Sequence, residues 1–372
     1  MYDLAMEFNQ MGNNVTVITL SEEIDRNLEI ENSNGITILR FKSGKIESAN
    51  SKLIRGLNEL LISYKIWIYG KKYFKKNPSD LLVWYSPTIF FGKIISKLKK
   101  INKSKTYLIL RDIFPQWALD TGILKKGISY SFLKQMEIFQ YNQADKIGVQ
   151  SPSNLDYFNH NNLKYNLEVL YNWTKVQTES PPFYNFREKF GLKNKVVFFY
   201  GGNIGVAQDI DNIIRLAINL TDKVEAHFLI VGDGSEFNRI KNIIKDKNLN
   251  NISLHPSVTQ NKYLSMLSEF DIGIISLDKN FKTSNFPGKM LGYMEFSLPM
   301  LISLNKGNDL KNLIEKFDSG YVSFNGDDTN FANNALKLLN NSIKRKKMGI
   351  NSRKLLEKKF TSKNAANMIL SQ

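Results

Sequence analysis

The sequence predicts an α/β protein made of two parallel, doubly wound sheets in tandem. Its 372 residues exceed the ~150 residues typical of one domain. Short apolar runs rich in β-branched residues recur along the chain, and the stretches between them are long enough for crossover helices. This alternation stops at 174–195, around Pro181-Pro182, and then resumes. Two similar domains joined near residue 175 are therefore expected, with one large sheet as the alternative.

The expected elements follow in chain order. A short helix with Leu4, Ala5 and Phe8 on one face precedes the first strand. The expected strands of the first half lie at 15–20, 36–41, 81–85, 107–110, 146–150 and 167–171. Those of the second half lie at 196–200, 226–231, 252–255, 272–277, 300–304 and 321–324. The predicted organisation is an N-terminal domain at 1–173, a linker at 174–194, a second domain at 195–345, and a C-terminal helix at 346–372 that packs back on the first domain.

Composition limits the chemistry. Hydrophobic residues make up 42% of the chain, which excludes a disordered protein, and the net charge of +16 favours an anionic partner such as a nucleotide, a nucleic acid or a membrane surface. Cysteine is absent and the three histidines, His160, His227 and His255, are scattered, so no disulfide, thiolate or resident metal is expected. No apolar run is long enough to span a bilayer and no signal peptide is visible, which predicts a cytoplasmic protein.

Four turns in the second half follow predicted strands, where ligands of parallel sheets bind. Three are short and rich in small residues: Gly201-Gly202-Asn203-Ile204-Gly205, Gly232-Asp233-Gly234 and Pro256-Ser257. The fourth, 283–294, enters a helix with Pro287 and Lys289 near its start. Glycine lets backbone N–H groups approach a phosphate, and a lysine adds charge. Tight turns and a solvated lysine are the structural alternatives.

These motifs carry a family resemblance. In order, FFYGGNIG, FLIVGDGSE, ISLHPSVTQNKYLSMLSEFDIGIISL and SNFPGKMLGYMEFSLPML resemble the nucleotide-sugar half of glycosyltransferase family 4, which has the GT-B fold of two Rossmann-like domains facing across a cleft. In the first half, MYDLAMEFNQMGNNVTVIT, ILRDIFPQWALDTGIL and VLYNW are similar to the family's acceptor-side domain. Within the family, the chain most resembles bacterial transferases of O-antigen and capsule assembly, particularly L-fucosamine transferases.

The resemblance implies transfer of a sugar, here an N-acetylated deoxyhexosamine, from a UDP-sugar to a lipid-linked oligosaccharide, with retained configuration and no required metal. It also implies roles for single residues. Gly201, Gly202 and Asn203 would face the diphosphate, while Gly232 and Ser257 would lie near the base. The residues around the sugar and diphosphate would be Ser284, Asn285, Phe286, Pro287, Gly288 and Lys289. Among these, Lys289 is the expected catalytic cation for the leaving group.

The sequence also departs from the family pattern. Two glutamates that the family has eight positions apart correspond to Ser284 and Gly292 here. Glu295, one helical turn after Gly292, is a candidate substitute at the donor, with a solvated helix glutamate as the alternative. The family's Arg and Lys clamp after the first strand of the second domain is also absent, because Asn203 and Asp209 lie in that region.

On the acceptor side, Asp112 follows a predicted strand within Arg111-Asp112-Ile113-Phe114-Pro115. A carboxylate at this place can orient or deprotonate an acceptor hydroxyl, so Asp112 is the second catalytic candidate. A helix-capping aspartate is the equally weighted alternative.

The beginning of the chain departs from the family as well. Members open with a strand and a Gly-rich loop before the helix that here begins at Met1, so ~20 residues of the pattern are missing, including the first strand of the sheet. Removal of a central strand would expose backbone groups that need partners. The expectation is that the chain is inactive or poorly folded unless an upstream extension exists.

Charge placement suggests how the acceptor is reached. Residues 42–105 contain 15 Lys and Arg against 3 acids, and aromatic residues such as Trp67, Tyr69, Tyr73 and Phe74 lie among the lysines. Residues 60–105 therefore predict a peripheral contact with the anionic inner face of the cytoplasmic membrane, where each well-placed cation contributes about 1 kcal/mol. A solvated lysine-rich face is the alternative, and it is the expected role of the second basic cluster at 344–359.

Two other functions are alternatives to sugar transfer. The +16 charge is compatible with a nucleic-acid-binding protein, although no helix-turn-helix, zinc-finger or RRM signature is present and no nucleic-acid partner is expected. A sugar-nucleotide epimerase would share the GT-B fold, but its acid-base chemistry calls for more carboxylates and histidines than these loops supply.

Overall fold

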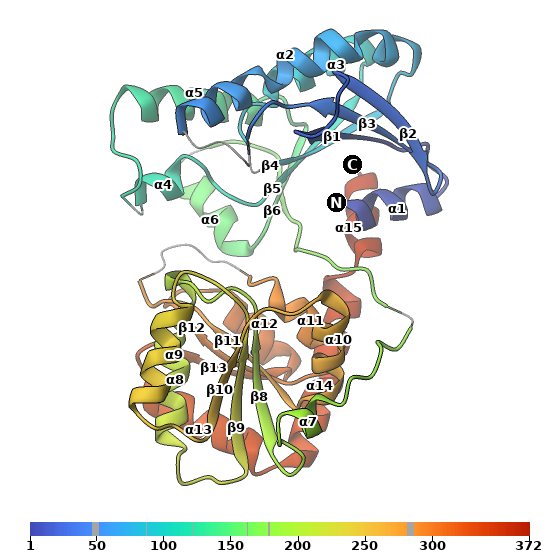
Figure 1. Cartoon of the computed structure of the whole chain (residues 1–372). Coiled ribbons are helices and arrows are strands. Elements are labelled where there is room, and N and C mark those ends of the chain that lie inside the picture. The colour runs from blue at the N-terminus through green and yellow to red at the C-terminus, as the bar shows by residue number, and fades with distance from the viewer. Residues whose placement is uncertain (47–51, 87, 121, 162, 178, 281–285) are drawn as a thin grey trace. The chain divides into compact units, whose positions relative to one another are not determined.

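The computed structural model describes residues 1–46, 52–86, 88–120, 122–161, 163–177, 179–280 and 286–372. The chain forms two compact units. One comprises Met1–Tyr171 together with Ser362–Gln372, and the other comprises Asn172–Thr361. Each unit has an α/β architecture (Figure 1). No helix in the described part is long and apolar enough to cross a membrane.

The first unit contains two sheets. In one, β1 (Thr16–Ser21) pairs in parallel with β3 (Ile36–Lys42), and β3 also pairs with β2 (Leu28–Ser33). In the other, four parallel strands follow the order β4-β5-β6-β7, at Leu81–Ser86, Lys105–Leu110, Lys146–Val149 and Leu167–Val169. Within the described residues, β1 and β4 each pair on one side only.

Strand β2 is not among the strands predicted from the sequence. It runs antiparallel to β3. The turn between them is Asn34-Gly35, with φ of +51° and +78° at the two residues. Both values belong to the left-handed region that a two-residue hairpin turn requires. The first sheet is therefore mixed, and the expectation of parallel strands throughout is wrong for this hairpin.

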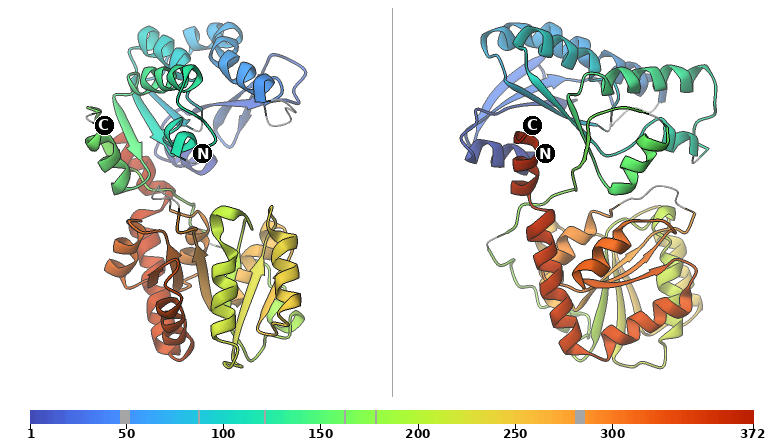
Figure 2. Two further views of the ribbon diagram at one scale, coloured as in Figure 1. Left: turned by 90° about the vertical axis from the view of Figure 1, so that its left-hand side faces the viewer. Right: turned by 180° about the vertical axis from the view of Figure 1, so that it is seen from behind.

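Helices cover these sheets. The helices α2, α3 and α5 contact one another in sequence and form a layer, while α15 packs against α1 (Figures 1 and 2). The Ser362 hydroxyl donates a hydrogen bond to Glu7 Oε1 over 2.8 Å, so the last helix is tied to the first. The helices of this unit are α1 (Tyr2–Gln10), α2 (Lys52–Lys76), α3 (Gly92–Asn102), α4 (Gln116–Asp120), α5 (Ile128–Tyr141), α6 (Pro152–His160) and α15 (Ser362–Leu370).

The second unit contains one parallel sheet of six strands in the order β10-β9-β8-β11-β12-β13. The chain forms β8 first, adds β9 and β10 on one side, and then returns to place β11 on the other side of β8. The strand order thus reverses between β8 and β11, which is the position where open α/β sheets bind ligands. The strands are β8 (Val196–Gly201), β9 (Ala226–Val231), β10 (Ile252–His255), β11 (Ile272–Ser276), β12 (Met300–Leu304) and β13 (Gly320–Phe324).

Helices lie on both faces of this sheet (Figure 2). One set is α8, α9 and α13, and the other includes α10, α11, α12 and α14. Because both faces are covered, the strands are apolar and buried along most of their length, as Phe198, Phe199 and Tyr200 illustrate. The helices are α7 (Phe186–Lys189), η1 (Val206–Gln208), α8 (Ile210–Asn219), α9 (Phe237–Asp246), α10 (Gln260–Glu269), α11 (Lys289–Glu295), α12 (Leu310–Phe317), α13 (Asp328–Leu339) and α14 (Ser342–Lys359).

The boundaries differ from those predicted. Residues of the expected linker 174–194 pack into the second unit, since Arg187 Nη2 forms an ion pair with Asp271 at 2.6 Å and the Tyr184 N–H donates to Ser265 Oγ at 3.1 Å. The expected domain end at 345 is wrong, because α14 continues to Lys359 within this unit. The segment 346–372 is not one helix, and only its last part, α15, belongs to the first unit.

Candidate functional site

Three loops at the carboxyl edge of the second sheet are joined by backbone hydrogen bonds. They follow the neighbouring strands β8, β9 and β10. The Gly202 N–H donates to Val231 O at 2.9 Å, and the Gly232 N–H donates to His255 O at 3.0 Å. The Ile204 N–H donates to Asp233 O at 2.8 Å. The three sequence-predicted turns therefore form one connected surface.

The close approach of these loops explains two of the glycines. A Cβ atom at Gly232 would lie 1.8 Å from the carbonyl oxygen of Gly202, and one at Gly234 would lie 2.3 Å from that of Ile204. Real side chains do not tolerate such distances from backbone atoms. Because Gly232 has no Cβ, the two loops can approach each other closely. This is a structural contribution to the site that does not depend on a base binding nearby.

The backbone N–H groups at the first loop are arranged differently from the expectation. The Gly201 N–H donates to the Tyr293 hydroxyl at 3.2 Å, and the Gly202 N–H is used by Val231. Neither of these two N–H groups is therefore free for a phosphate, and the role of Gly201 and Gly202 in facing the diphosphate stays a prediction. Within the described part of the chain, the N–H groups of Asn203 and Gly205 have no acceptor.

Lys289 lies beside this loop. It is the first residue of α11, and its amino group is buried with no hydrogen-bond partner among the described residues. Its Nζ lies 3.3 Å from the centroid of the Tyr200 ring and 3.5 Å from where a Cβ of Gly202 would be. Burial lowers the pKa of Lys289 well below its usual value. The solvated-lysine alternative is therefore wrong.

An uncompensated amine is unfavourable in a protein interior, because a buried charge needs a counter-charge or hydrogen bonds. Here the Lys289 amine lies beside the double-glycine turn. This turn is followed in the sequence by Asn203 and Gly205, whose N–H groups have no acceptor among the described residues. An anionic ligand at Gly202 would give Lys289 the partner that it lacks, and the charge-assisted hydrogen bonds would be strong. The arrangement is suited to a diphosphate.

The other residues around Lys289 are only partly described. Ser284 and Asn285 lie outside the described residues. Phe286 is 2% exposed and Pro287 is also buried, so both anchor the loop in the core, whereas Gly288 is exposed just before α11.

Ser257 is held by an aspartate that the sequence reasoning did not select. Both the backbone N–H and the hydroxyl of Ser257 donate to Asp233 Oδ2, the former at 3.2 Å. The Asn203 side chain is likewise engaged, since its Nδ2 donates to Gln208 Oε1 at 2.8 Å. These contacts fix the positions of the loops. Asp233 could have been selected from the sequence, because it lies within the predicted turn Gly232-Asp233-Gly234.

Glu295 is engaged by neighbouring segments of the second unit. Its carboxylate Oε1 accepts a hydrogen bond of 2.7 Å from the Gln177 N–H, and its carbonyl oxygen accepts one of 2.7 Å from Arg353 Nη1. It lies at the far end of α11 from Lys289 and anchors the segment that enters the second unit. The alternative of a solvated helix glutamate is therefore wrong, and donor binding by Glu295 stays a prediction.

In the first unit, Asp112 follows β5 and is exposed. The preceding Arg111 turns inward, and its guanidinium donates to Leu170 O at 2.5 Å and to Tyr171 O at 3.3 Å. Helix α4 begins only at Gln116, and Asp112 accepts no capping hydrogen bond among the described residues, so the capping alternative is wrong. Partial removal from water raises the pKa of Asp112, while Arg111 opposes this shift.

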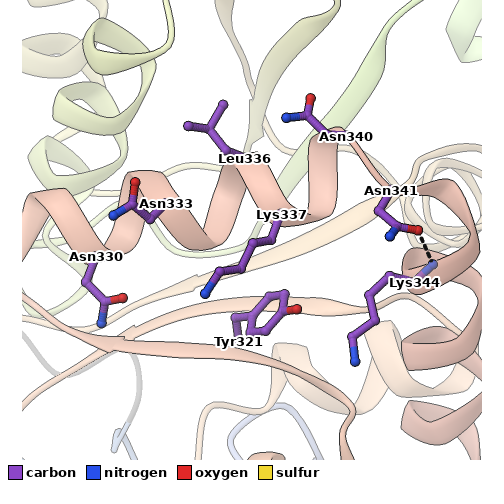
Figure 3. A pocket seen from close by; sticks show the side chains of 8 residues that line it. All are labelled: Tyr321, Asn330, Asn333, Leu336, Lys337, Asn340, Asn341 and Lys344. Atoms are coloured by element: carbon purple, nitrogen blue, oxygen red, sulfur yellow. Dashed lines mark hydrogen bonds between the residues drawn. The ribbon is translucent and has the colours of Figure 1, made fainter.

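A separate pocket of about 660 Å³ runs along α13 and the edge strand β13 (Figure 3). None of the sequence-predicted site residues lines it. Its walls carry amide and lysine side chains around one ring: Tyr321, Asn330, Asn333, Leu336, Lys337, Asn340, Asn341 and Lys344. No group of three or more His, Asp or Glu side chains that could hold a metal ion occurs in the described ranges.

Two α/β units, the second with a parallel sheet and an anion-suited site at its switch point, match the GT-B fold. Residues 183–355, which lie within the second unit, match the family described as "Glycosyl transferases group 1". The GT-B fold is thus confirmed. It is also seen in HepE of Anabaena, solved in complex with UDP, which has a TM-score of 0.65 and 14% identity over 91% of this chain and 86% of that chain.

Two relatives are similar in sequence. WbjE of Pseudomonas aeruginosa, named as a glycosyltransferase, is 26% identical over 58% of this chain and 55% of its own length. WcaI of Escherichia coli strain K12, named as a glycosyl transferase of colanic acid biosynthesis, is 21% identical over 64% of this chain and 60% of its own length. The aligned part thus spans little more than half of each relative.

Proposed function

We propose that the protein is a retaining glycosyltransferase that moves a sugar, an N-acetylated deoxyhexosamine, from a UDP-sugar to a lipid-linked oligosaccharide in O-antigen or capsular polysaccharide synthesis. The observation that carries the proposal is the buried, unpartnered amino group of Lys289 beside Gly202, at the switch point of a glycosyltransferase group 1 domain. The UDP complex of HepE supports the choice of nucleotide, and the name of WcaI supports polysaccharide assembly.

In the proposed reaction, the bond from the sugar's anomeric carbon to the diphosphate breaks and a bond to the acceptor oxygen forms. Lys289 would neutralise the charge that develops on the departing UDP, and the N–H groups of Asn203 and Gly205 would donate hydrogen bonds to it. Asp112 would orient or deprotonate the acceptor hydroxyl, and its raised pKa makes it a better proton acceptor than an ordinary aspartate. No metal is required in this proposal.

The membrane contact proposed for residues 60–105 is supported by the outer surface of α2 and α3. On α2, Leu61 is 45% exposed and Tyr64 is 62% exposed, and on α3 the lysines Lys93, Lys97 and Lys100 are exposed. Apolar side chains next to cations suit an anionic lipid surface. Not every predicted residue contributes, since Phe74 is buried in the core.

The direct test is sugar transfer. Purified protein would be incubated with UDP-N-acetylhexosamines and their deoxy forms, with and without a polyprenyl-diphosphate-linked disaccharide, while UDP release and acceptor mass are measured. UDP release with a matching gain of acceptor mass, unchanged by EDTA, is the expected result. Interconversion of the UDP-sugar without acceptor would instead show the epimerase, and neither reaction with any UDP-sugar would contradict the proposed donor.

A further inference from the structure

Tyr200 touches two parts of the candidate donor site. It is the penultimate residue of β8 and is fully buried. The face of its ring lies 3.3 Å from Lys289 Nζ, measured to the ring centroid. Its hydroxyl donates a hydrogen bond of 2.6 Å to the backbone carbonyl of Asn203. One side chain thus contacts both the amine and the loop that flank Gly202.

The ring contact is electrostatic as well as steric. The negative face of an aromatic ring attracts a cation, and the attraction is stronger when water is excluded. Among the described residues, the ring is the favourable contact that Lys289 has in place of a hydrogen bond. The amine also lies next to the double-glycine turn, since Nζ and Cε are both 3.5 Å from the place that a Cβ of Gly202 would occupy.

The hydroxyl contact acts on the loop. Asn203 directly follows the double glycine, and its N–H is one of the two without an acceptor. By holding the Asn203 carbonyl, the hydroxyl sets the orientation of the peptide that follows Asn203. Burial raises the pKa of Tyr200, so the hydroxyl stays protonated and remains a donor.

We infer that Tyr200 is a positioning residue of the donor site, which holds the Lys289 amine and the Asn203 loop in the geometry that receives a diphosphate. The inference rests on the proposed function for the identity of the ligand, while the placement of Lys289 by the ring can be tested without any ligand. Tyr200 does not touch the reacting atoms in this account, and it acts through Lys289.

Two substitutions separate the two contacts. Tyr200→Phe keeps the ring and removes the hydroxyl, whereas Tyr200→Leu removes both. Phe228→Leu is the matched control, because Phe228 is a fully buried aromatic residue on the neighbouring strand β9 that stacks on Phe198 and does not contact Lys289. A general loosening of the core would affect this control as much as Tyr200→Leu.

The ligand-free measurement is acetylation of Lys289 by limiting acetic anhydride between pH 7 and 10, followed by mass spectrometry of the peptide. In the natural protein and in Tyr200→Phe, Lys289 should react with the same pH profile. In Tyr200→Leu it should react about tenfold faster, because the ring no longer holds it. The same profile in all variants, or an equal change in Phe228→Leu, would overturn the inference.

The ligand measurement is UDP affinity by titration calorimetry. Tyr200→Leu should weaken UDP binding about tenfold, and Tyr200→Phe about threefold, because it loses only the loop contact. Equal affinity in the natural protein and in Tyr200→Leu would overturn the inference. If the natural protein binds no UDP, the proposed donor fails, and the acetylation profiles still decide whether Tyr200 positions Lys289.

Discussion

The strand-end loops of the two units present their candidate residues in opposite ways. In the second unit, the loops after β8 and β9 are so close that Gly232 has no room for a Cβ, and the Lys289 amine is buried. In the first unit, Asp112 is exposed while its neighbour Arg111 anchors the loop to Leu170. The proposed donor side is thus specified by backbone packing and one enclosed cation, and the proposed acceptor side by an open side chain.

This difference has a consequence for substitutions. Changes at the closely packed glycines of the second unit should affect stability and ligand binding together, because the same backbone contacts provide both. A change at Asp112 should affect chemistry alone, because no packing depends on its side chain.

The largest loss of folding stability is expected from Gly232→Ala. The new methyl group would meet the Gly202 carbonyl oxygen at 1.8 Å, so the two loops must separate. The free energy of unfolding should fall by ~3 kcal/mol, at the upper end of the overpacking range, as measured by urea unfolding. Gly288→Ala is the control, since nothing lies within 4 Å of its added Cβ, and it should change stability by less than ~0.5 kcal/mol. Equal stability of the two variants would contradict the backbone-packing account.

Asp112→Asn should lower the rate of sugar transfer about 10²- to 10⁴-fold, as expected on loss of a general base. UDP affinity and the unfolding midpoint should stay unchanged, because the side chain is exposed and caps no helix. Initial rates and titration calorimetry on the same preparation would test both parts. Full retention of transfer would remove Asp112 from the mechanism.

Lys289→Met should change activity and stability in opposite directions. Transfer should fall about 100-fold with loss of the leaving-group cation. The free energy of unfolding should rise by ~1 kcal/mol, because an apolar side chain replaces a buried amine that has no hydrogen-bond partner in the described structure. Turnover equal to that of the natural protein would show that Lys289 is not the catalytic cation.

The lowered pKa of Lys289 predicts a pH dependence. Lys289 is neutral above its lowered pKa in the empty protein, and a bound diphosphate favours its charged form, so binding takes up a proton. UDP affinity should therefore fall as pH rises above that pKa, by up to about tenfold per pH unit.

For folding stability, the pH dependence caused by Lys289 has the opposite sign. The unfolded chain holds the extra proton between the lowered pKa and ~10.4, so this group's contribution to stability rises with pH in that window. Lys289→Met should abolish both trends, and an unchanged slope of UDP affinity in this variant would assign the pH dependence to another group.

The smallest effect concerns the membrane. Tyr64→Ser combined with Leu61→Ser should lower sedimentation with phosphatidylglycerol-containing liposomes at low salt about tenfold. The paired control is Ile343→Ser, an 80% exposed residue of the second unit, which should leave sedimentation unchanged. If the natural protein does not sediment, the membrane contact fails, whereas equal loss in both variants would place it elsewhere.

Much of the fold could be predicted because buried parallel strands leave a clear apolar signal. All twelve strands expected from the sequence overlap observed strands. The exception, β2, alternates apolar and acidic residues in Leu28-Glu29-Ile30-Glu31 and ends at Asn34-Gly35. That alternation and turn were the available signal for an edge hairpin.

The candidate site was predicted less completely, for physical reasons. Gly202 and Lys289 lie next to each other, but Tyr200 and Tyr293 belong to apolar runs that are typical of core. Nothing in such a run shows that the Tyr293 hydroxyl would use the Gly201 N–H. A helical offset from Gly292 likewise does not reveal that α11 ends at Glu295, whose carboxylate accepts a hydrogen bond from the Gln177 backbone.

The second unit is proposed to hold a nucleoside diphosphate at Gly202 and Lys289. Thermal stabilisation of the purified chain by UDP, GDP, ADP and dTDP tests this binding, with duplex DNA as a control and Lys289→Met measured alongside. A ligand at 100 times its Kd stabilises the native state by about 2.7 kcal/mol. A rise in Tm with UDP that is lost in Lys289→Met is the expected result. No rise with any nucleotide, or an equal rise in Lys289→Met, would contradict the proposed binding.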